Sequence, residues 1–216
     1  VSYLFWIFQV SSSHLHSNTK DYSLPNASWS PIMVRLYNEH MEKMVDGTGT
    51  RLPGYLHSLQ FLKEADLARI TKAIPVQMVE DTRHFFWITE MKKVGFEYII
   101  FHGASEKKCI CLLQPEPRLE GLPEVIHGGA LGTMTDTFFM TLYNSANAVF
   151  TGTMTITFKR PLTRGSVVRL EAKVTGMEGR KVFLSCEAQS SDRTVFFAKA
   201  SGKAIRILFS SCLCPS

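Results

Sequence analysis

The chain has 216 residues, of which 45% are hydrophobic and 20% are charged, a composition typical of a globular protein with a sizeable core. Its formal net charge of +5 is mildly basic. However, no run of five or more Lys or Arg occurs, which makes nucleic-acid binding a weak hypothesis. An anionic small ligand explains the positive charge about as well as a nucleic acid does. The five cysteines show neither a C-x-x-C motif nor zinc spacing with histidines, so a reducing intracellular compartment is favoured.

The first 20 residues combine an apolar, aromatic stretch, too short to span a bilayer, with a polar stretch that contains no acidic residue. This pattern allows a truncated signal or transit segment, but it is poor in the Arg that transit segments contain. We therefore expect residues 1–20 to be a targeting or disordered segment outside the fold, and we expect no transmembrane segment.

Residues 21–93 are predicted to form an N-terminal helical extension. Pro31 begins an amphipathic pattern that ends near Gly47 and indicates a helix. The remaining predicted elements of the extension are a Pro/Gly loop at 48–58, a second helix at 61–74 and a strand at 85–88.

Residues 94–208 are predicted to form the main domain, followed by a tail at 209–216. Its predicted elements, in chain order, are strands at 96–101 and 108–114 that form a hairpin, a proline-rich connection, a helix at 128–146, and strands at 149–159, 166–175, 180–190 and 194–208. In the strand at 149–159, alternation places Thr151, Thr153, Thr155 and Thr157 on one face.

The helix at 128–146 is apolar on most of its surface, which is typical of a helix enclosed by other structure. A sheet wrapped around one central helix is the simplest way to enclose it, so the pattern predicts a hotdog-like α+β fold. Such a sheet leaves an edge strand open, and pairing of two edges predicts a homodimer.

The segment His127-Gly128-Gly129 precedes this helix, and Asp136 lies within it. Bare backbone N–H groups at a helix start favour a developing negative charge, and a carboxylate can act as a base. An oxyanion site and a base on one helix would suit hydrolysis of an acyl compound. Spacing alone leaves the alternative open that the glycines make a tight turn and that Asp136 caps a neighbouring backbone.

The flanking segments carry a specific resemblance. Matching motifs are residues 20–29, R-L-P at 51–53, G-F-E-Y at 95–98, I-H-G-G-A at 126–130 with Met134 and Asp136, F-K-R-P at 158–161, S-V-V at 166–168, E-G-R-K at 178–181 and S-C at 185–186. With these motifs the chain resembles the acyl-coenzyme A thioesterases of the hotdog fold, closest to thioesterase superfamily members four and five.

The resemblance implies roles for four residues. Asp136 would be the catalytic carboxylate, a general base for water rather than a direct nucleophile. The Gly129 N–H would hold the thioester oxygen, His127 would orient or polarise the same carbonyl, and Thr151 would help to place the water. The site would be shared across the dimer, with Asp136 and Thr151 from different subunits.

The resemblance also implies the residues that hold the coenzyme A part: Thr157, Lys159, Arg180, Lys181, Val182, Phe183, Leu184 and Ser185. The three cations among them would bind phosphates, and a strand edge would pair with the pantetheine amides. No metal or redox cofactor is needed, because coenzyme A is part of the substrate.

The implied activity is hydrolysis of medium- to long-chain fatty acyl-CoA, as in a palmitoyl-CoA hydrolase. The implied location is mitochondrial, with the cytoplasm as second choice. The resemblance also implies a place in fatty acid and lipid metabolism, and a protein kinase as partner, because one family member is associated with regulation of a protein kinase. The sequence leaves open whether two dimers pair into a tetramer.

Two alternatives remain open: a non-catalytic acyl-CoA-binding or protein-kinase-regulatory module on the same fold, and a hydratase or dehydratase that uses an Asp/His pair. The chain departs from the family at Thr157, where one member has asparagine, and at Glu124, which replaces a glycine next to the His-Gly-Gly turn. The tail also looks unrelated.

Overall fold

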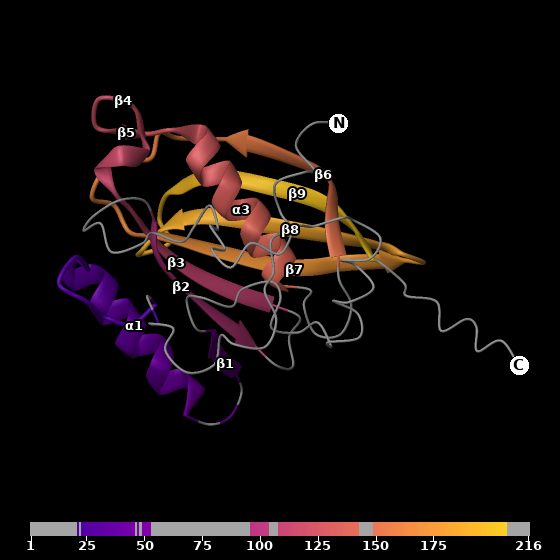
Figure 1. Ribbon diagram of the computed structural model, residues 1–216, viewed down its shortest axis with the longest axis horizontal. Coiled ribbons are helices and arrows are strands. Elements are labelled where there is room, and N and C mark those ends of the chain that lie inside the picture. Colours follow the sequence, from indigo (N-terminus) through magenta and orange to yellow (C-terminus); the bar gives the residue numbers. More distant parts are fainter. Residues whose placement is uncertain are drawn as a thin grey trace, which may run out of the picture.

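The computed structural model describes residues 21, 23–45, 47, 49–52, 96–103, 108–142 and 149–206. In these residues, strands in the order β1-β2-β3-β7-β8-β9-β6 form one antiparallel seven-stranded sheet, with helix α3 packed on one face and helix α1 near its β1–β3 end (Figure 1). This arrangement confirms the predicted α+β hotdog fold, an antiparallel sheet that curves around one long helix.

The element bounds follow the chain. The helices are α1 (Pro31–Met44), the short 3₁₀ turn η2 (Pro117–Leu119) and α3 (Gly128–Leu142). The strands of the large sheet are β1 (Gly49–Leu52), β2 (Phe96–Gly103), β3 (Lys108–Pro115), β6 (Val149–Phe158), β7 (Val168–Glu178), β8 (Lys181–Ser190) and β9 (Phe196–Arg206). The two short strands β4 (Glu120–Leu122) and β5 (Val125–Ile126) form a separate hairpin.

The predicted N-terminal helix is confirmed as α1. Ser30 is its N-cap and accepts a hydrogen bond from the Met33 N–H at 3.3 Å, while Pro31, which has no N–H to satisfy, starts the helix. The buried residues Met33, Leu36 and His40 recur at helical spacing and form the face that packs on the sheet.

Alternation along the strands separates two cores. Ile99 and Phe101 of β2 belong to the cluster under α1, whereas Tyr98 and Ile100 of the same strand belong to the cluster under α3. Because neighbouring residues of a strand point to opposite faces, α1 and α3 cover opposite faces of the sheet.

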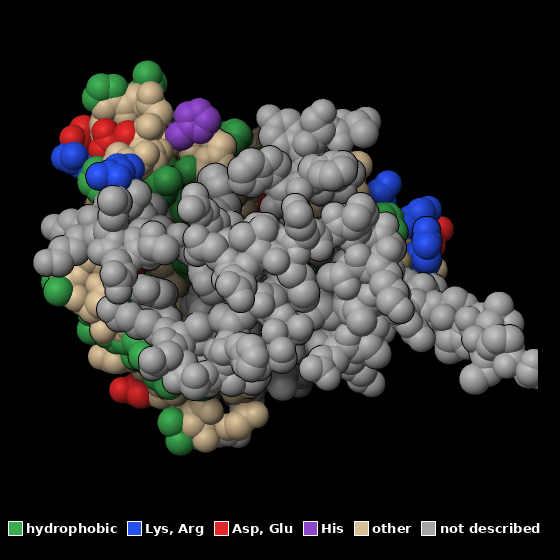
Figure 2. Space-filling model, in the orientation of Figure 1, with side chains coloured by type: hydrophobic (Ala, Val, Ile, Leu, Met, Phe, Trp, Pro, Cys, Tyr) green, Lys and Arg blue, Asp and Glu red, His purple; other side chains and the backbone are tan. Residues whose placement is uncertain are grey.

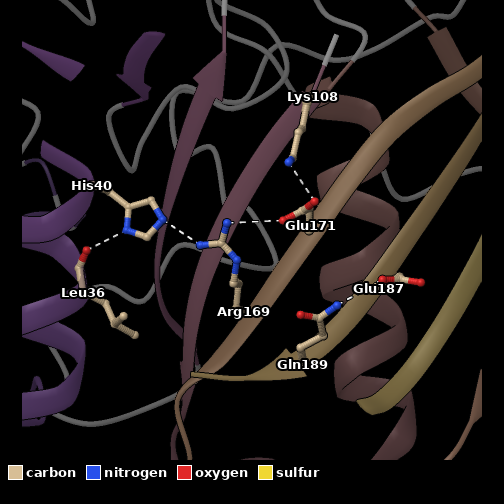
Figure 3. A network of polar contacts seen from close by, with 7 residues as sticks. All are labelled: Leu36, His40, Lys108, Arg169, Glu171, Glu187 and Gln189. Carbon is tan, nitrogen blue, oxygen red and sulfur yellow. Dashed lines mark hydrogen bonds and ion pairs between the residues drawn. The ribbon is translucent and has the colours of Figure 1, made fainter. Parts of the chain in front are cut away.

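A buried polar network lies beneath α1 (Figure 3). His40 contacts the Leu36 carbonyl oxygen through Nδ1 at 2.7 Å and Arg169 Nη1 through Nε2 at 2.6 Å. Arg169 of β7 also pairs with Glu171, which in turn pairs with Lys108 of β3 at 2.8 Å. The network ties α1 to two neighbouring strands of the sheet.

Helix α3 has the predicted apolar face, since Leu131, Met134, Phe138 and Leu142 are all buried. The helix lies across β6, β7, β9, β3 and β8. It is therefore enclosed on the side that the sheet curves around, as its composition predicts. None of the helices in the described ranges is long and apolar enough to span a membrane.

The structure corrects some predicted elements. Residues 49–52 are strand β1, paired with β2, and not a loop; a four-residue strand gains its hydrogen bonds from its partner and needs little pattern of its own. The proline-rich connection contains η2 and the β4–β5 hairpin. The predictions for residues 1–20, 61–74, 85–88, 143–146 and 209–216 lie outside the described residues.

Candidate active site

The turn into α3 is built around the imidazole of His127. The His127 carbonyl oxygen accepts a hydrogen bond from the Ala130 N–H at 2.9 Å, and the His127 ring nitrogen Nδ1 accepts one from the Gly129 N–H at 2.9 Å. A backbone N–H can only donate, so Nδ1 carries no proton in this arrangement. His127 is thus the N-cap of the helix, with an imidazole in place of the usual hydroxyl or carboxylate.

Two glycines leave room for this ring. A β-carbon at Gly121 would lie 2.8 Å from His127 Cδ2, and one at Gly129 would lie 2.8 Å from Nδ1. The imidazole therefore sits between the β4–β5 hairpin and the first turn of α3, while remaining exposed to solvent. The structure brings the predicted residues His127 and Gly129 into direct contact.

The hairpin that holds this ring is itself fixed by ion pairs. Arg164 lies 2.7 Å from a carboxylate oxygen of Glu124 and 3.5 Å from one of Glu120. Acidic and basic side chains gather at this end of the molecule, where Figure 1 places the β4–β5 hairpin (Figure 2). Glu124 adopts a φ of 65°, a conformation that favours glycine, and its charge is paired.

The second predicted pair, Asp136 and Thr151, also meets. The Thr151 hydroxyl donates a hydrogen bond of 2.6 Å to Asp136 Oδ1, and its oxygen lies 3.4 Å from the Met140 sulfur. Burial raises the pKa of the Asp136 carboxyl above its ordinary value, and the hydrogen bond from Thr151 offsets part of that shift. A half-buried carboxyl with a raised pKa is suited to take up a proton.

This contact bears on two expectations, and it corrects the second. Asp136 and Thr151 meet within one chain, so their pairing does not require different subunits. Thr151 also does not share a face with Thr153, Thr155 and Thr157, because a β-bulge interrupts the alternation of β6 between Thr151 and Thr153.

A pocket of about 340 Å³ lies beside the start of α3. Its lining residues are Ile126, Gly128, Leu131, Phe158, Lys159, Arg160, Pro161 and Leu162. The Lys159 and Arg160 side chains are exposed next to the positive end of the helix, so this pocket attracts anions. Lys159 is one of the predicted ligand residues, and Phe158 and Arg160 of the same F-K-R-P motif also line this pocket, which the sequence alone does not predict.

The remaining predicted ligand residues lie elsewhere in the chain. Arg180 is exposed in the turn before β8, near the start of β6, because the Arg206 N–H bonds the Arg180 carbonyl and Arg206 is opposite Val149. Thr157 and Lys159 are at the other end of β6. A strand rises about 3.3 Å per residue, so they lie about 30 Å from the end near Arg180. One chain therefore does not bring these two groups of cations together.

The expectation for residues 181–185 is also corrected. Strand β8 pairs with β7 on one side and β9 on the other, so its backbone offers no free edge to a pantetheine. Val182 and Leu184 are buried in the core, whereas Lys181, Phe183 and Ser185 point to the outer face, and Lys181 lies 3.5 Å from Glu178. An internal position follows from the strand order, which alternation alone does not reveal.

Comparisons with known proteins agree on one family. The family model described as "Thioesterase superfamily" matches residues 124–197. The chain is 36% identical over 192 residues to acyl-coenzyme A thioesterase THEM5 of Mus musculus, covering 88% of this chain and 77% of that relative. It is 34% identical to acyl-coenzyme A thioesterase THEM4 of Xenopus laevis, covering 91% and 82%.

Solved structures with a similar fold include thioesterase superfamily member 2 from Mus musculus. It matches with a TM-score of 0.46 and 18% identity, over 50% of this chain and 80% of that one. The PaaI protein of E. coli, from the phenylacetic acid degradation operon, matches with a TM-score of 0.44 and 22% identity, over 48% and 75%.

Proposed function

Because this chain belongs to the family of acyl-coenzyme A thioesterases that includes THEM4 and THEM5, we propose that it hydrolyses fatty acyl-CoA to free fatty acid and coenzyme A. We extend the proposal to acyl chains of medium to long length. The observation that carries it is the hydrogen bond between Thr151 of β6 and Asp136 of α3, the helix whose first turn contains the exposed Gly129.

In the proposed mechanism Asp136 acts as a general base. It takes a proton from a water molecule as the water oxygen bonds to the thioester carbon. The thioester oxygen, now negative, accepts a hydrogen bond from the Gly129 N–H. When the carbon–sulfur bond breaks, the proton on Asp136 passes to the thiolate, and free thiol and free acid leave with Asp136 ionised again.

The spacing of the two groups supports attack through water. Gly129 and Asp136 are seven residues apart on one helix, about 10 Å along its axis. A carbonyl group and one water in series, joined by hydrogen bonds of about 2.8 Å, span a distance of that order. Thr151 gives its only proton to Asp136, so its oxygen is left to accept a hydrogen bond from that water.

Substrate binding requires an exchange at the start of α3. In this structure the Gly129 N–H is bonded to His127 Nδ1. The thioester oxygen replaces Nδ1 as the acceptor, and the released imidazole is then placed to donate to the same oxygen through its protonated nitrogen.

For the coenzyme A part, we propose a site completed by a second copy of the chain. Strand β6 is paired only with β9 and ends the sheet, so its outer edge is open among the described residues. Antiparallel pairing of β6 with its copy would bring Arg180 and Lys181 of one subunit towards Lys159 and Thr157 of the other. A homodimer would thereby gather the cations that one chain keeps apart.

One observation favours a second candidate. The oxyanion donor is already satisfied by His127, which is also the state expected of a module that binds acyl-CoA without cleaving it, including one that regulates a protein kinase.

On the resemblance alone we also propose a mitochondrial location, which imaging of the tagged protein tests.

The test is release of free thiol from a panel of acyl-CoA chain lengths by the wild type, Asp136→Asn and Thr151→Val. We expect turnover in the wild type and a loss of about a hundredfold or more in Asp136→Asn, because general-base catalysis contributes this much. Sedimentation of the protein tests the dimer. Binding of acyl-CoA without turnover in the wild type would support the binding module instead.

A further inference from the structure

Strand β6 contains one residue more than its partner β9 over the segment that carries Thr151. Thr151 is opposite Ala204 and Thr153 is opposite Lys203, so Gly152 has no opposite residue. This two-against-one register is a β-bulge, a feature that commonly redirects a side chain next to an active site.

The bulge determines which face of the sheet Thr151 occupies. In an uninterrupted strand, Thr151 and Thr153 would point to the same face. Here Thr153 and Thr155 are exposed on the outer face, whereas Thr151 points to α3 and reaches Asp136. Ile156, on the α3 side beyond the bulge, lies 3.3 Å from where a β-carbon of Gly132 would be, which confirms the orientation of the strand.

Residue 152 has little room for a side chain. A β-carbon at Gly152 would lie 3.1 Å from the Lys203 carbonyl oxygen and 3.3 Å from Ile205 Cγ1. The Lys203 carbonyl is part of β9, which is paired with β8 and β6 on its two sides. It therefore cannot move away as the end of a flexible side chain could.

We propose that Gly152 is a positioning residue whose bulge directs the Thr151 hydroxyl at Asp136. The proposal deepens the proposed function and rests on it for the catalytic importance of the Thr151–Asp136 contact. The geometry of the bulge itself does not depend on the proposed function.

The first test is Gly152→Val. A β-branched residue favours a regular strand, and its β-carbon does not fit the bulge. The start of β6 then slips by one residue, and a slip by one residue moves every side chain of that segment to the other face. We expect kcat to fall about tenfold or more with a KM changed less than about twofold, because misplacing a catalytic group acts on the chemical step.

The second test is deletion of Gly152. Deletion removes the extra residue and leaves Thr151 opposite Ala204 and Thr153 opposite Lys203, so Thr151 stays on the α3 face. We expect the deletion to retain more activity than the substitution, whereas deleting a strand residue usually harms a protein more than replacing it. If Gly152→Val does not fold, Gly152→Ala replaces it as the smaller intrusion.

A matched control comes from a second bulge in the same sheet. The register of β7 and β8 shifts between Val174 and Gly176, and a β-carbon at Gly176 would meet its nearest atom, in Phe183, only at 3.7 Å. Gly176→Val therefore also changes a glycine next to a bulge but has room, and we expect the activity of the wild type.

A readout independent of turnover is the titration of the Asp136 carboxyl, followed by its ¹³C resonance. The Thr151 hydrogen bond lowers the pKa of Asp136, so Gly152→Val should raise it and the deletion should not. If this pattern appears in a protein that cleaves no acyl-CoA, the proposed function fails and the positioning role stands. An unchanged titration in Gly152→Val, with or without a loss of turnover, overturns the positioning role.

Discussion

His127 Nδ1 accepts a hydrogen bond of 2.9 Å from the Gly129 N–H, and this bond caps the helix. The Gly129 N–H is also the donor that the proposed mechanism assigns to the thioester oxygen. Under the proposed mechanism, the same two residues would therefore serve both the stability of the helix start and catalysis. A cap contributes about 1 kcal/mol, which substrate binding must offset when the acceptor changes.

Two substitutions of His127 separate these roles. Asn is a good N-cap residue and Ala is not, so His127→Ala should lower the free energy of unfolding by about 1 kcal/mol while His127→Asn should keep it near the wild-type value. Both should lower kcat, because neither side chain polarises the carbonyl as imidazole does. Urea unfolding and acyl-CoA hydrolysis measure the two effects. Wild-type activity in His127→Asn would show that the histidine is only a cap.

Glu124 combines a φ of 65° with an ion pair of 2.7 Å to Arg164. Glu124→Ala removes the ion pair but keeps the unfavourable backbone, whereas Glu124→Gly removes both. We expect the glycine variant to be more stable than the alanine variant by about 1 kcal/mol, the cost of this conformation for a residue with a β-carbon. Urea unfolding of the two variants checks this, and equal stabilities would contradict it.

The same pair bears on ligand binding. The Glu124 charge is neutralised by Arg164, so it should not repel an anionic substrate. We expect the double variant Glu124→Ala/Arg164→Ala, which removes both charges of the pair, to leave the KM for acyl-CoA within about twofold of the wild type, since a neutral pair contributes little field beyond a Debye length. A KM several-fold lower in the variant would show that the pairing does not screen the site.

The elements that could be predicted from the sequence are those whose pattern is local. Pro31 and the spacing of Met33, Leu36 and His40 predict α1, and the glycines after His127 predict the start of α3. These signals depend on caps and on helical periodicity, both of which act within a few residues. The likeness of the His-Gly-Gly turn and Asp136 to a known family was specific for the same reason.

The features that could not be predicted depend on partners far away in the chain. The direction of Thr151 follows from the register of β6 against β9, and simple alternation therefore assigned it to the wrong face. Likewise, Val182 and Leu184 are buried because β8 lies between β7 and β9. Strand order and register are set by tertiary packing, which a single strand's sequence does not encode.

The close approach of α3 to β9 gives a prediction for Gly202. A β-carbon there would lie 2.6 Å from Phe139 Cε2, and Phe139 is buried, so it cannot swing away. We expect Gly202→Ala to lower the free energy of unfolding by about 1–3 kcal/mol through overpacking. Phe139→Leu should reduce the effect of Gly202→Ala in a double-mutant cycle, whereas additive effects would mean that the two residues do not clash.

The buried contact between His40 and Arg169 predicts how stability depends on pH (Figure 3). Nδ1 of His40 faces the Leu36 carbonyl oxygen, which can only accept, so Nδ1 holds the proton and Nε2 accepts from Arg169. Protonating Nε2 would remove that acceptor and set two cations against each other.

Burial lowers the pKa of His40. The positive charges of Arg169 and Lys43 lower this pKa further, whereas the Leu36 carbonyl and Glu39 oppose the shift. A lowered pKa in the folded state means that the unfolded chain binds the proton first. Stability is therefore complete above about pH 6.5, the pKa of unfolded histidine, and is lost as pH falls from there towards the folded pKa. The loss from one proton is at most about 1.4 kcal/mol per pH unit.

His40→Gln tests this, because glutamine can donate to Leu36 and accept from Arg169 at every pH. Urea unfolding between pH 5 and pH 8 should show a smaller loss of stability at low pH in His40→Gln than in the wild type. Burial also lowers the pKa of His102, so His102→Asn serves as the control that removes its share of the slope. Parallel curves for the wild type and His40→Gln would mean that His40 does not titrate in this window. Faster amide exchange in α1 at low pH, in the wild type alone, would locate the loss at the contact between α1 and the sheet.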